Sequence, residues 1–108
     1  MTQVGPVIMG HPVARGMLES AGIVLSFRTS DRTTGDTHYR YERTGHKQGD
    51  VTIRKETPEI TPSAVNLIDH RPLSGFSTVE DWQDAIERMH GSLDTRGYVY
   101  RIELVGDE

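Results

Sequence analysis

Residues 76–91, FSTVEDWQDAIERMHG, form the clearest helical pattern in the sequence. Ser77 and Glu80 have the spacing of a capping box, in which each side chain accepts a hydrogen bond from a main-chain N–H group of the first turn. Gly91 is a typical stop signal. The apolar side chains in between share one helical face: Val79, Trp82, Ala85, Ile86 and Met89. The rest of the chain must supply an apolar surface that covers this face, and we expect Trp82 to be a core residue.

The remaining apolar segments are short, and several alternate apolar and polar residues as β-strands do. Residues 12–20 predict a second, shorter helix, because Pro suits its first turn and Gly22 follows as a stop. Residues 29–36 are polar turn formers and predict a surface loop. Strands are predicted at the short apolar opening, residues 7–9, and at residues 23–28, 37–43, 51–53, 64–68 and 98–105. This order predicts an α+β fold in which the strands curl into a small β-barrel with two flanking helices.

The length and composition exclude several kinds of site. A chain of 108 residues suits one core, so we expect residues 1–108 to form a single domain. There is no Cys, and the five His include no His-x-x-x-His pair, so neither a disulfide nor a metal site is expected. The sequence has no glycine motif for phosphate binding, and no cofactor is expected.

No apolar segment approaches the ~20 residues that cross a bilayer. The N-terminus, MTQVGPVIMGHP, also lacks the basic flank and long apolar stretch of a secretion signal. We therefore expect a soluble, cytoplasmic protein that makes no contact with a membrane.

Charge is distributed unevenly along the chain. Residues 1–58 contain eight Lys and Arg against six Asp and Glu, and residues 59–108 contain four against ten, which gives the total of −4. The basic stretch, residues 39–55, reads YRYERTGHKQGDVTIRK. Its candidates for phosphate contacts are Arg40, Arg43, Lys47 and Arg54, and its candidates for stacking on a base are Tyr39 and Tyr41. The alternative is a solvated sheet surface on which the tyrosines pack against the barrel and the arginines pair with Glu42.

Arg28 ends the apolar strand IVLSFR and is the strongest single candidate for a ligand contact. Arginine is rarely buried without a partner, so we expect this side chain to point into a cleft toward an anion. The alternative is an ion pair with Asp31 or Asp50. Ser26, two residues earlier, is a candidate nucleophile or ligand donor, although a Ser in a strand more often bonds to nearby main chain.

The order and spacing of three segments resemble the ASCH domain, a branch of the PUA-like superfamily. The first is His11–Pro12, a short helix, Gly22 and a strand ending in Phe27–Arg28. The others are Gly49-Asp50-Val51, and residues 75–82 followed by residues 98–102. The resemblance covers nearly the whole chain. It implies a small PUA-like β-barrel with two flanking helices and a cleft between them, a surface proposed to bind RNA.

Some small members of that family are amidohydrolases that act on acylated cytidine. They use a Lys and a Thr on the first long strand and a Glu before the last helix. By position, the Thr corresponds to Ser26 and the Lys to Ile23. The Glu falls near Ser74, and its candidate replacement is Glu80, which the capping box already uses. An isoleucine cannot activate a neighbouring hydroxyl group. The resemblance therefore implies a protein that binds RNA or a nucleotide-like ligand without catalysis.

Two alternatives remain open. The first is an amidohydrolase on a modified nucleoside, in which Lys47 or His46 activates Ser26. The second is a protein-interaction module in which the acidic surface of the helix at residues 76–91 contacts a partner protein.

Overall fold

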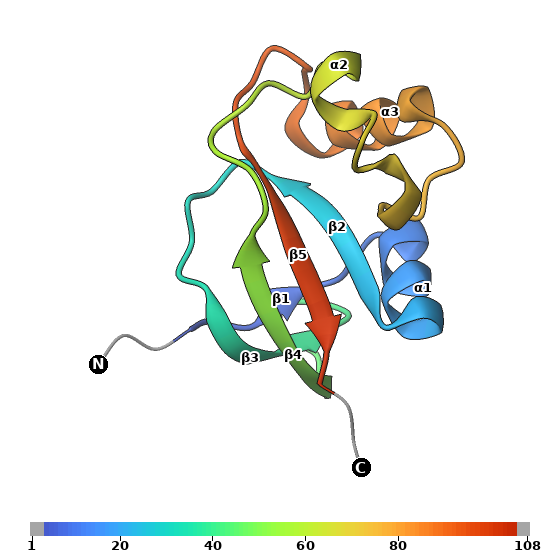
Figure 1. The fold of residues 1–108 in the computed structure, drawn as a ribbon. Coiled ribbons are helices and arrows are strands. Elements are labelled where there is room, and N and C mark those ends of the chain that lie inside the picture. The colour runs from blue at the N-terminus through green and yellow to red at the C-terminus, as the bar shows by residue number, and fades with distance from the viewer. Residues whose placement is uncertain (1–3, 106–108) are drawn as a thin grey trace.

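The computed structural model describes residues 4–105, which form a five-stranded sheet, three α-helices and a short 3₁₀ helix (Figure 1). The elements in chain order are β1 (Val7–Ile8), α1 (Pro12–Ala21), β2 (Ile23–Arg28), β3 (Gly35–Arg40), β4 (Lys47–Lys55), α2 (Ala64–Leu67), η1 (Arg71–Leu73), α3 (Val79–His90) and β5 (Tyr98–Leu104). The prediction of an α+β fold is confirmed.

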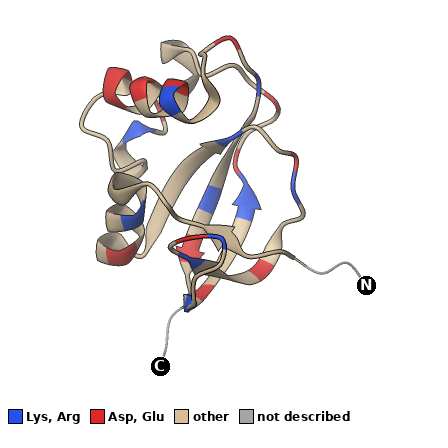
Figure 2. Ribbon diagram, turned by 180° about the vertical axis from the view of Figure 1, so that it is seen from behind, with Lys and Arg blue, Asp and Glu red and all other residues tan. Residues whose placement is uncertain are grey.

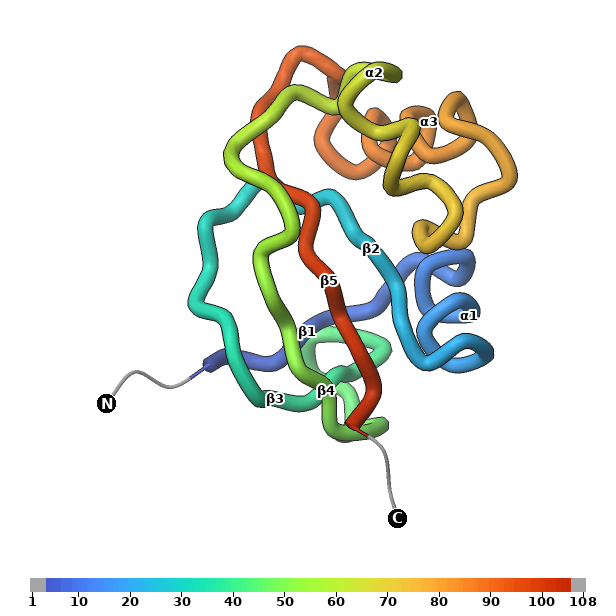
Figure 3. The backbone as a smooth tube through the Cα atoms, viewed as in Figure 1, coloured from blue at the N-terminus to red at the C-terminus, as the bar shows by residue number. Residues whose placement is uncertain are grey.

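The sheet is strongly curled, and its strand order is β1-β3-β4-β5-β2 (Figures 1 and 3). β1 pairs with β3 in parallel, and the other neighbours are antiparallel. β1 and β2 are the two edge strands, and they do not pair with each other. The predicted barrel is therefore a half-barrel that is open between β1 and β2.

Each face of the curled sheet carries an apolar cluster, because successive side chains of a strand point to opposite faces. The inner cluster comprises Val7, Met9, Leu18, Val24, Tyr39, Val51, Ile53, Tyr100 and Ile102. The outer cluster joins the sheet to α2 and α3 and comprises Leu25, Phe27, Leu67, Val79, Trp82, Ile86 and Val99. Trp82 is 3% exposed, so its prediction as a core residue is confirmed.

Both predicted helices are present, and local signals define their ends. α1 begins after His11, whose Nδ1 accepts a hydrogen bond from Val13 N at 3.2 Å, and ends at Gly22 with φ 79°. α3 begins one residue later than the capping box predicts, because Thr78 caps it by accepting from Asp81 N at 3.0 Å. It ends at Gly91 with φ 81°, a left-handed conformation that favours glycine.

The strand predicted at residues 64–68 is wrong, since these residues form α2. Its β-branched side chains do not enter the sheet: Val65 is 78% exposed and Ile68 is 58% exposed. The preceding segment contains two prolines and is not a strand of the sheet in the described part of the chain, although Ile60 forms an isolated bridge with Gly97. A short helix then provides local hydrogen-bond partners for the main-chain groups of this segment, and Leu67 packs in the outer cluster.

Three smaller predictions also need correction. β3 begins and ends earlier than residues 37–43, because the pairing is irregular between Tyr39 and Arg40 and the chain then turns. β4 is longer than residues 51–53 and runs from Lys47 to Lys55, because it pairs with both β3 and β5. Met89 does not join the buried face of α3, since it is 62% exposed.

Lys and Arg positions are spread over strands, loops and helices in the view from behind, and acidic positions gather on α3 (Figure 2). Within residues 4–105, none of the helices has the length and apolar character that crossing a bilayer would require.

Candidate ligand-binding pocket

A pocket of about 450 Å³ lies at the open side of the half-barrel. Its walls come from β2, from the chain that joins β1 to α1, and from α3. Most of its lining is apolar, and the polar side chains are few: His11, Ser26 and Arg28. The volume falls in the range of small-molecule sites, which is roughly 300–1,000 Å³.

Arg28 bridges the two unpaired edges of the sheet. Its Nη2 donates a hydrogen bond to the main-chain oxygen of Ile8 at 3.1 Å and contacts the sulfur of Met9 at 3.4 Å. Its Nε is buried and has no hydrogen-bond partner within residues 4–105. The pocket therefore contains a guanidinium group with an unused donor.

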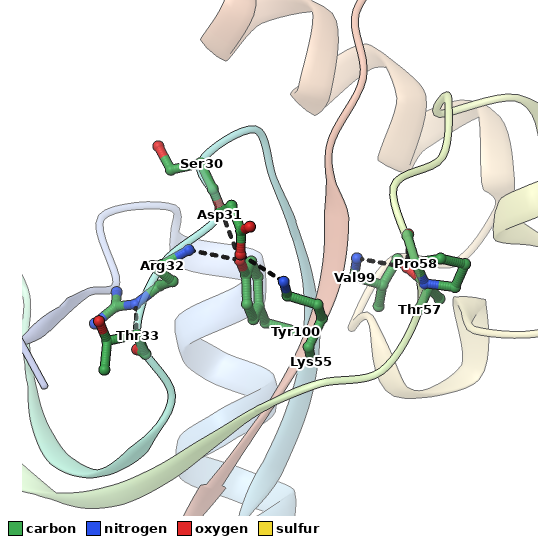
Figure 4. Close-up of polar contacts among 9 residues, drawn as sticks. All are labelled: Ser30, Asp31, Arg32, Thr33, Lys55, Thr57, Pro58, Val99 and Tyr100. Carbon is green, nitrogen blue, oxygen red and sulfur yellow. Dashed lines mark hydrogen bonds and ion pairs between the residues drawn. The ribbon is translucent and has the colours of Figure 1, made fainter.

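The alternative that Arg28 forms an ion pair with Asp31 or Asp50 is wrong. Asp31 is paired with Lys55 at 2.5 Å, as Figure 4 shows, and Asp50 is paired with Lys47 at 2.8 Å. No carboxylate lines the pocket in the described part of the chain. The positive charge of Arg28 is therefore not compensated by an acidic side chain there.

Burial, with a smaller contribution from the nearby charge of Arg32, lowers the pKa of Arg28 to about 10. The group still carries its charge at neutral pH. Because an unpaired charge in low-dielectric surroundings is unfavourable, an anionic or carbonyl oxygen placed beside this guanidinium would be stabilised.

The polar loop after β2 is held beside this site by Tyr100, which is fully buried. The Tyr100 hydroxyl donates to the main-chain oxygen of Ser30 at 2.7 Å and accepts from Arg32 N at 3.0 Å (Figure 4). Arg32 in turn donates to the main-chain oxygen of Gly5. These contacts give the predicted surface loop a defined course between β2 and β3.

Main-chain packing fixes the position of Arg28. A Cβ atom at Gly97 would lie 2.4 Å from the main-chain oxygen of Arg28 and 2.8 Å from the ring of Phe27. No side chain fits at such distances unless the main chain moves. Gly97 therefore allows β5 and the end of β2 to approach each other.

Ser26 lies in the pocket, but it lacks an activating group there. The pKa of His11 is lowered by burial and by Arg88, so the ring is neutral near pH 7. Because its Nδ1 accepts a hydrogen bond from Val13 N, the ring proton is on Nε2, which makes Nε2 a donor rather than a base. The predicted activators, Lys47 and His46, do not line the pocket.

The two tyrosines predicted to stack on a base both make contacts within the fold. Tyr39 is 4% exposed and belongs to the inner cluster. Its hydroxyl and that of Tyr41 donate to the same oxygen of Glu19, at 2.8 and 2.6 Å. The guanidinium of Arg15 lies over the Tyr41 ring, 4.4 Å from its centre. Tyr39 therefore offers no free face to a base, and Arg15 covers one face of Tyr41.

The predicted phosphate contacts do not gather around the pocket either. Arg40 donates to His38 and to the main-chain oxygen of Arg43. Lys47 and Arg54 lie seven positions apart on β4, which corresponds to roughly 23 Å along a strand. None of these residues lines the pocket with Arg28. Of the predicted site residues, the structure brings together Ser26 and Arg28.

Most of the apolar wall of the pocket was not predicted from the sequence. It includes Met9, Phe76, Trp82 and Ile86. The rings of Phe76 and Trp82 are nearly parallel, with centres 6.5 Å apart. Their apolar character predicts burial, and Trp82 is indeed buried, but no spacing in the sequence shows that a cavity opens beside them. That cavity depends on how α3 packs against β2.

Comparison with known proteins gives no family for this chain: it matches no family model, no curated protein and no solved structure. The resemblance to the ASCH domain stays a prediction from its local motifs.

Proposed function

We propose that the chain binds a nucleotide-like ligand, either free or as an unpaired nucleotide of an RNA, in the Arg28 pocket and without catalysis. The observation that carries this proposal is Arg28, which lines an apolar pocket and whose buried Nε has no hydrogen-bond partner among the described residues. An anionic or carbonyl oxygen of the ligand accepts from this group.

The surroundings of Arg28 favour a compact ligand. The cavity of about 450 Å³ accommodates one nucleotide-sized molecule, and its apolar walls include Phe76 and Trp82. The cations of residues 39–55 lie elsewhere, so the ligand is held mainly by the pocket and not by a long track of phosphate contacts. The absence of a base or carboxylate among the described lining residues supports binding without hydrolysis.

The test is a titration of nucleoside 5′-monophosphates and a short single-stranded RNA into the wild-type protein and Arg28→Met. Trp82 is the single tryptophan and lines the pocket, so its fluorescence reports occupancy. A hydrogen bond to a charged group is worth about 1.5–3 kcal/mol, so we expect Arg28→Met to weaken binding roughly 10- to 150-fold.

The matched control is Arg54→Met, which removes the same charge from an exposed position on β4 outside the pocket. We expect its affinity to stay within about two-fold of wild type. Equal affinities for wild type and Arg28→Met, with both folded by circular dichroism, would contradict the proposal.

A further inference from the structure

One edge of β2 has unused main-chain hydrogen-bonding groups. β2 is the last strand in the sheet order and pairs only with β5 among the described strands. In an antiparallel pair, alternate residues bond to the partner strand and the residues between them point their N–H and C=O groups the other way.

A single contact fixes which residues point away. Leu104 N donates to the main-chain oxygen of Gly22 at 2.8 Å, so this pair belongs to the bonded set. The register then places Val24, Ser26 and Arg28 in the bonded set as well. The N–H and C=O groups of Leu25 and Phe27 therefore point away from β5, toward the open side of the half-barrel.

The open side at Leu25 and Phe27 is where the pocket lies. Both residues line it, together with the chain from Ile8 to Pro12 on the opposite side. Main-chain polar groups away from water need hydrogen-bond partners, and in the described part of the chain no second strand supplies them at this edge. The pocket thus adds a row of main-chain acceptors and donors to the cation of Arg28.

We propose that the main chain of Leu25 and Phe27 binds the hydrogen-bonding edge of a planar ring, such as a nucleobase, that lies in the plane of the sheet. The proposal rests on the proposed function and identifies the part of the ligand that the protein recognises. A ring donor bonds to the C=O of Leu25, and the adjacent ring acceptor bonds to the N–H of Phe27. Arg28 binds a further oxygen of the ligand.

The shape of the site distinguishes a ring from an added peptide strand. A peptide strand needs an edge that is free along its length. Here Arg28 crosses from β2 to the main-chain oxygen of Ile8 and closes the far end of the edge. The helix α1 packs against β2 near its start. The free part of the edge is short and enclosed, which suits a compact planar group.

The first experiment compares ligands on the full, ¹⁵N-labelled chain. The reference ligand is the nucleoside 5′-monophosphate, among the four common ones, that binds most tightly. It is compared with ribose 5-phosphate, which has no base, and with the same nucleotide methylated at a ring nitrogen of its base-pairing edge. We expect ribose 5-phosphate to bind at least ten-fold more weakly, and the methylated analogue about ten-fold more weakly, because each lacks ring hydrogen bonds.

The second measurement is amide hydrogen exchange of the same samples. We expect the N–H of Phe27 to exchange faster than those of Ser26 and Arg28 in the free protein, and to slow several-fold when the nucleotide binds. Ribose 5-phosphate should leave it unchanged.

The outcomes separate this inference from the proposed function. Ribose 5-phosphate could bind as tightly as the nucleotide, with Arg28→Met abolishing the binding of both ligands. The inference that the main chain recognises the ring would then be wrong, while the proposal that a ligand binds at Arg28 would stand. Concentration-dependent protection of Phe27 without ligand would show that a second copy of the chain pairs with this edge, and would also overturn the inference. If neither the nucleotides nor the short single-stranded RNA binds, both proposals fail.

Discussion

The Arg28 pocket and the basic stretch of residues 39–55 contain the same kind of charge in opposite surroundings. In the basic stretch the cations are exposed or already bonded: Lys47 is paired with Asp50, and Arg40 donates to His38. In the pocket the guanidinium of Arg28 is partly buried, with its Nε fully buried, and no carboxylate lies among the described lining residues. A high density of charge in sequence thus marks a solvated surface here, whereas one unmatched buried charge marks the candidate site.

The tyrosines of the two regions differ in the same way. Tyr39 and Tyr41 in the basic stretch are tied to Glu19, and Tyr100 beside the pocket is tied to main chain of the following loop. All three hydroxyl groups are used within the fold. The comparison predicts that changes in the basic stretch affect stability more than binding, and that changes in the pocket do the reverse.

The largest expected effect on stability comes from Glu19→Gln. This change replaces the carboxylate that accepts from both Tyr39 and Tyr41 by a neutral amide. Because Glu19 is exposed, we expect a loss of about 1 kcal/mol in the free energy of unfolding, measured by urea denaturation at pH 7. Nucleotide affinity should not change. Glu87→Gln, on the exposed face of α3, is the control and should have little effect.

The same variant gives a pH test. The hydrogen bonds from Tyr41 and then Tyr39 lower the pKa of Glu19 below its ordinary 4.5. The stabilisation is therefore complete above pH 4.5 and is lost as the pH falls through the lower pKa of the folded state. The stability difference between wild type and Glu19→Gln should shrink as the pH falls below 4.5, and a difference that persists down to the lowest pH at which both proteins fold would contradict the assignment.

Arg28→Met should stabilise the fold while it weakens binding. The methionine removes an uncompensated buried charge and fills similar space, although it gives up the hydrogen bond to Ile8. We expect the free energy of unfolding to rise by about 1 kcal/mol, measured by thermal and urea denaturation. A clear decrease would mean that the bridge between β1 and β2 is the main role of this side chain.

Salt dependence distinguishes the two regions in the intact protein. If one cation of the pocket contacts the ligand, the affinity for a short single-stranded RNA falls with a logarithmic slope of about −0.7, which is roughly a three-fold loss between 50 and 200 mM salt. If four cations of the basic stretch track phosphates, the slope approaches about −2.8 and the loss is roughly 50-fold. We expect the shallow slope.

The smallest effect is expected for Lys47→Ala. Its ion pair with Asp50 joins two exposed side chains, and such pairs contribute little. We expect changes within about 0.5 kcal/mol in stability and within two-fold in affinity. A ten-fold loss of RNA affinity would show that the RNA binds to the basic stretch and not to the Arg28 pocket.

The sequence predicts the elements whose signals are local. The helix caps, the stop glycines and the alternation of β2 and β5 are short-range patterns, and both helices and these strands are where they were expected. Residues 64–68 include β-branched side chains, which favour a strand, but the segment before them meets the sheet at an isolated bridge and Leu67 packs into the outer cluster from a helix.

The candidate site was predictable only in part for the same reason. Arg28 and Ser26 share a strand, so their proximity follows from the sequence. Phe76, Trp82 and Met9 join them through the packing of α3 and of the chain after β1, which depends on long-range contacts. The partners of Tyr39 and Tyr41 on α1 could not be found either, because Glu19 lies about twenty residues away.

The close approach at Gly97 has an evolutionary consequence. A chain that retains this pocket must retain a residue without a side chain at that position, whatever happens to the loops around it. Glycine at 97 together with arginine at 28 thus forms a two-position signature by which distant relatives with the same pocket can be sought. A relative that keeps the glycine but has another residue in place of the arginine would be expected to retain the fold and to lose the proposed ligand contact.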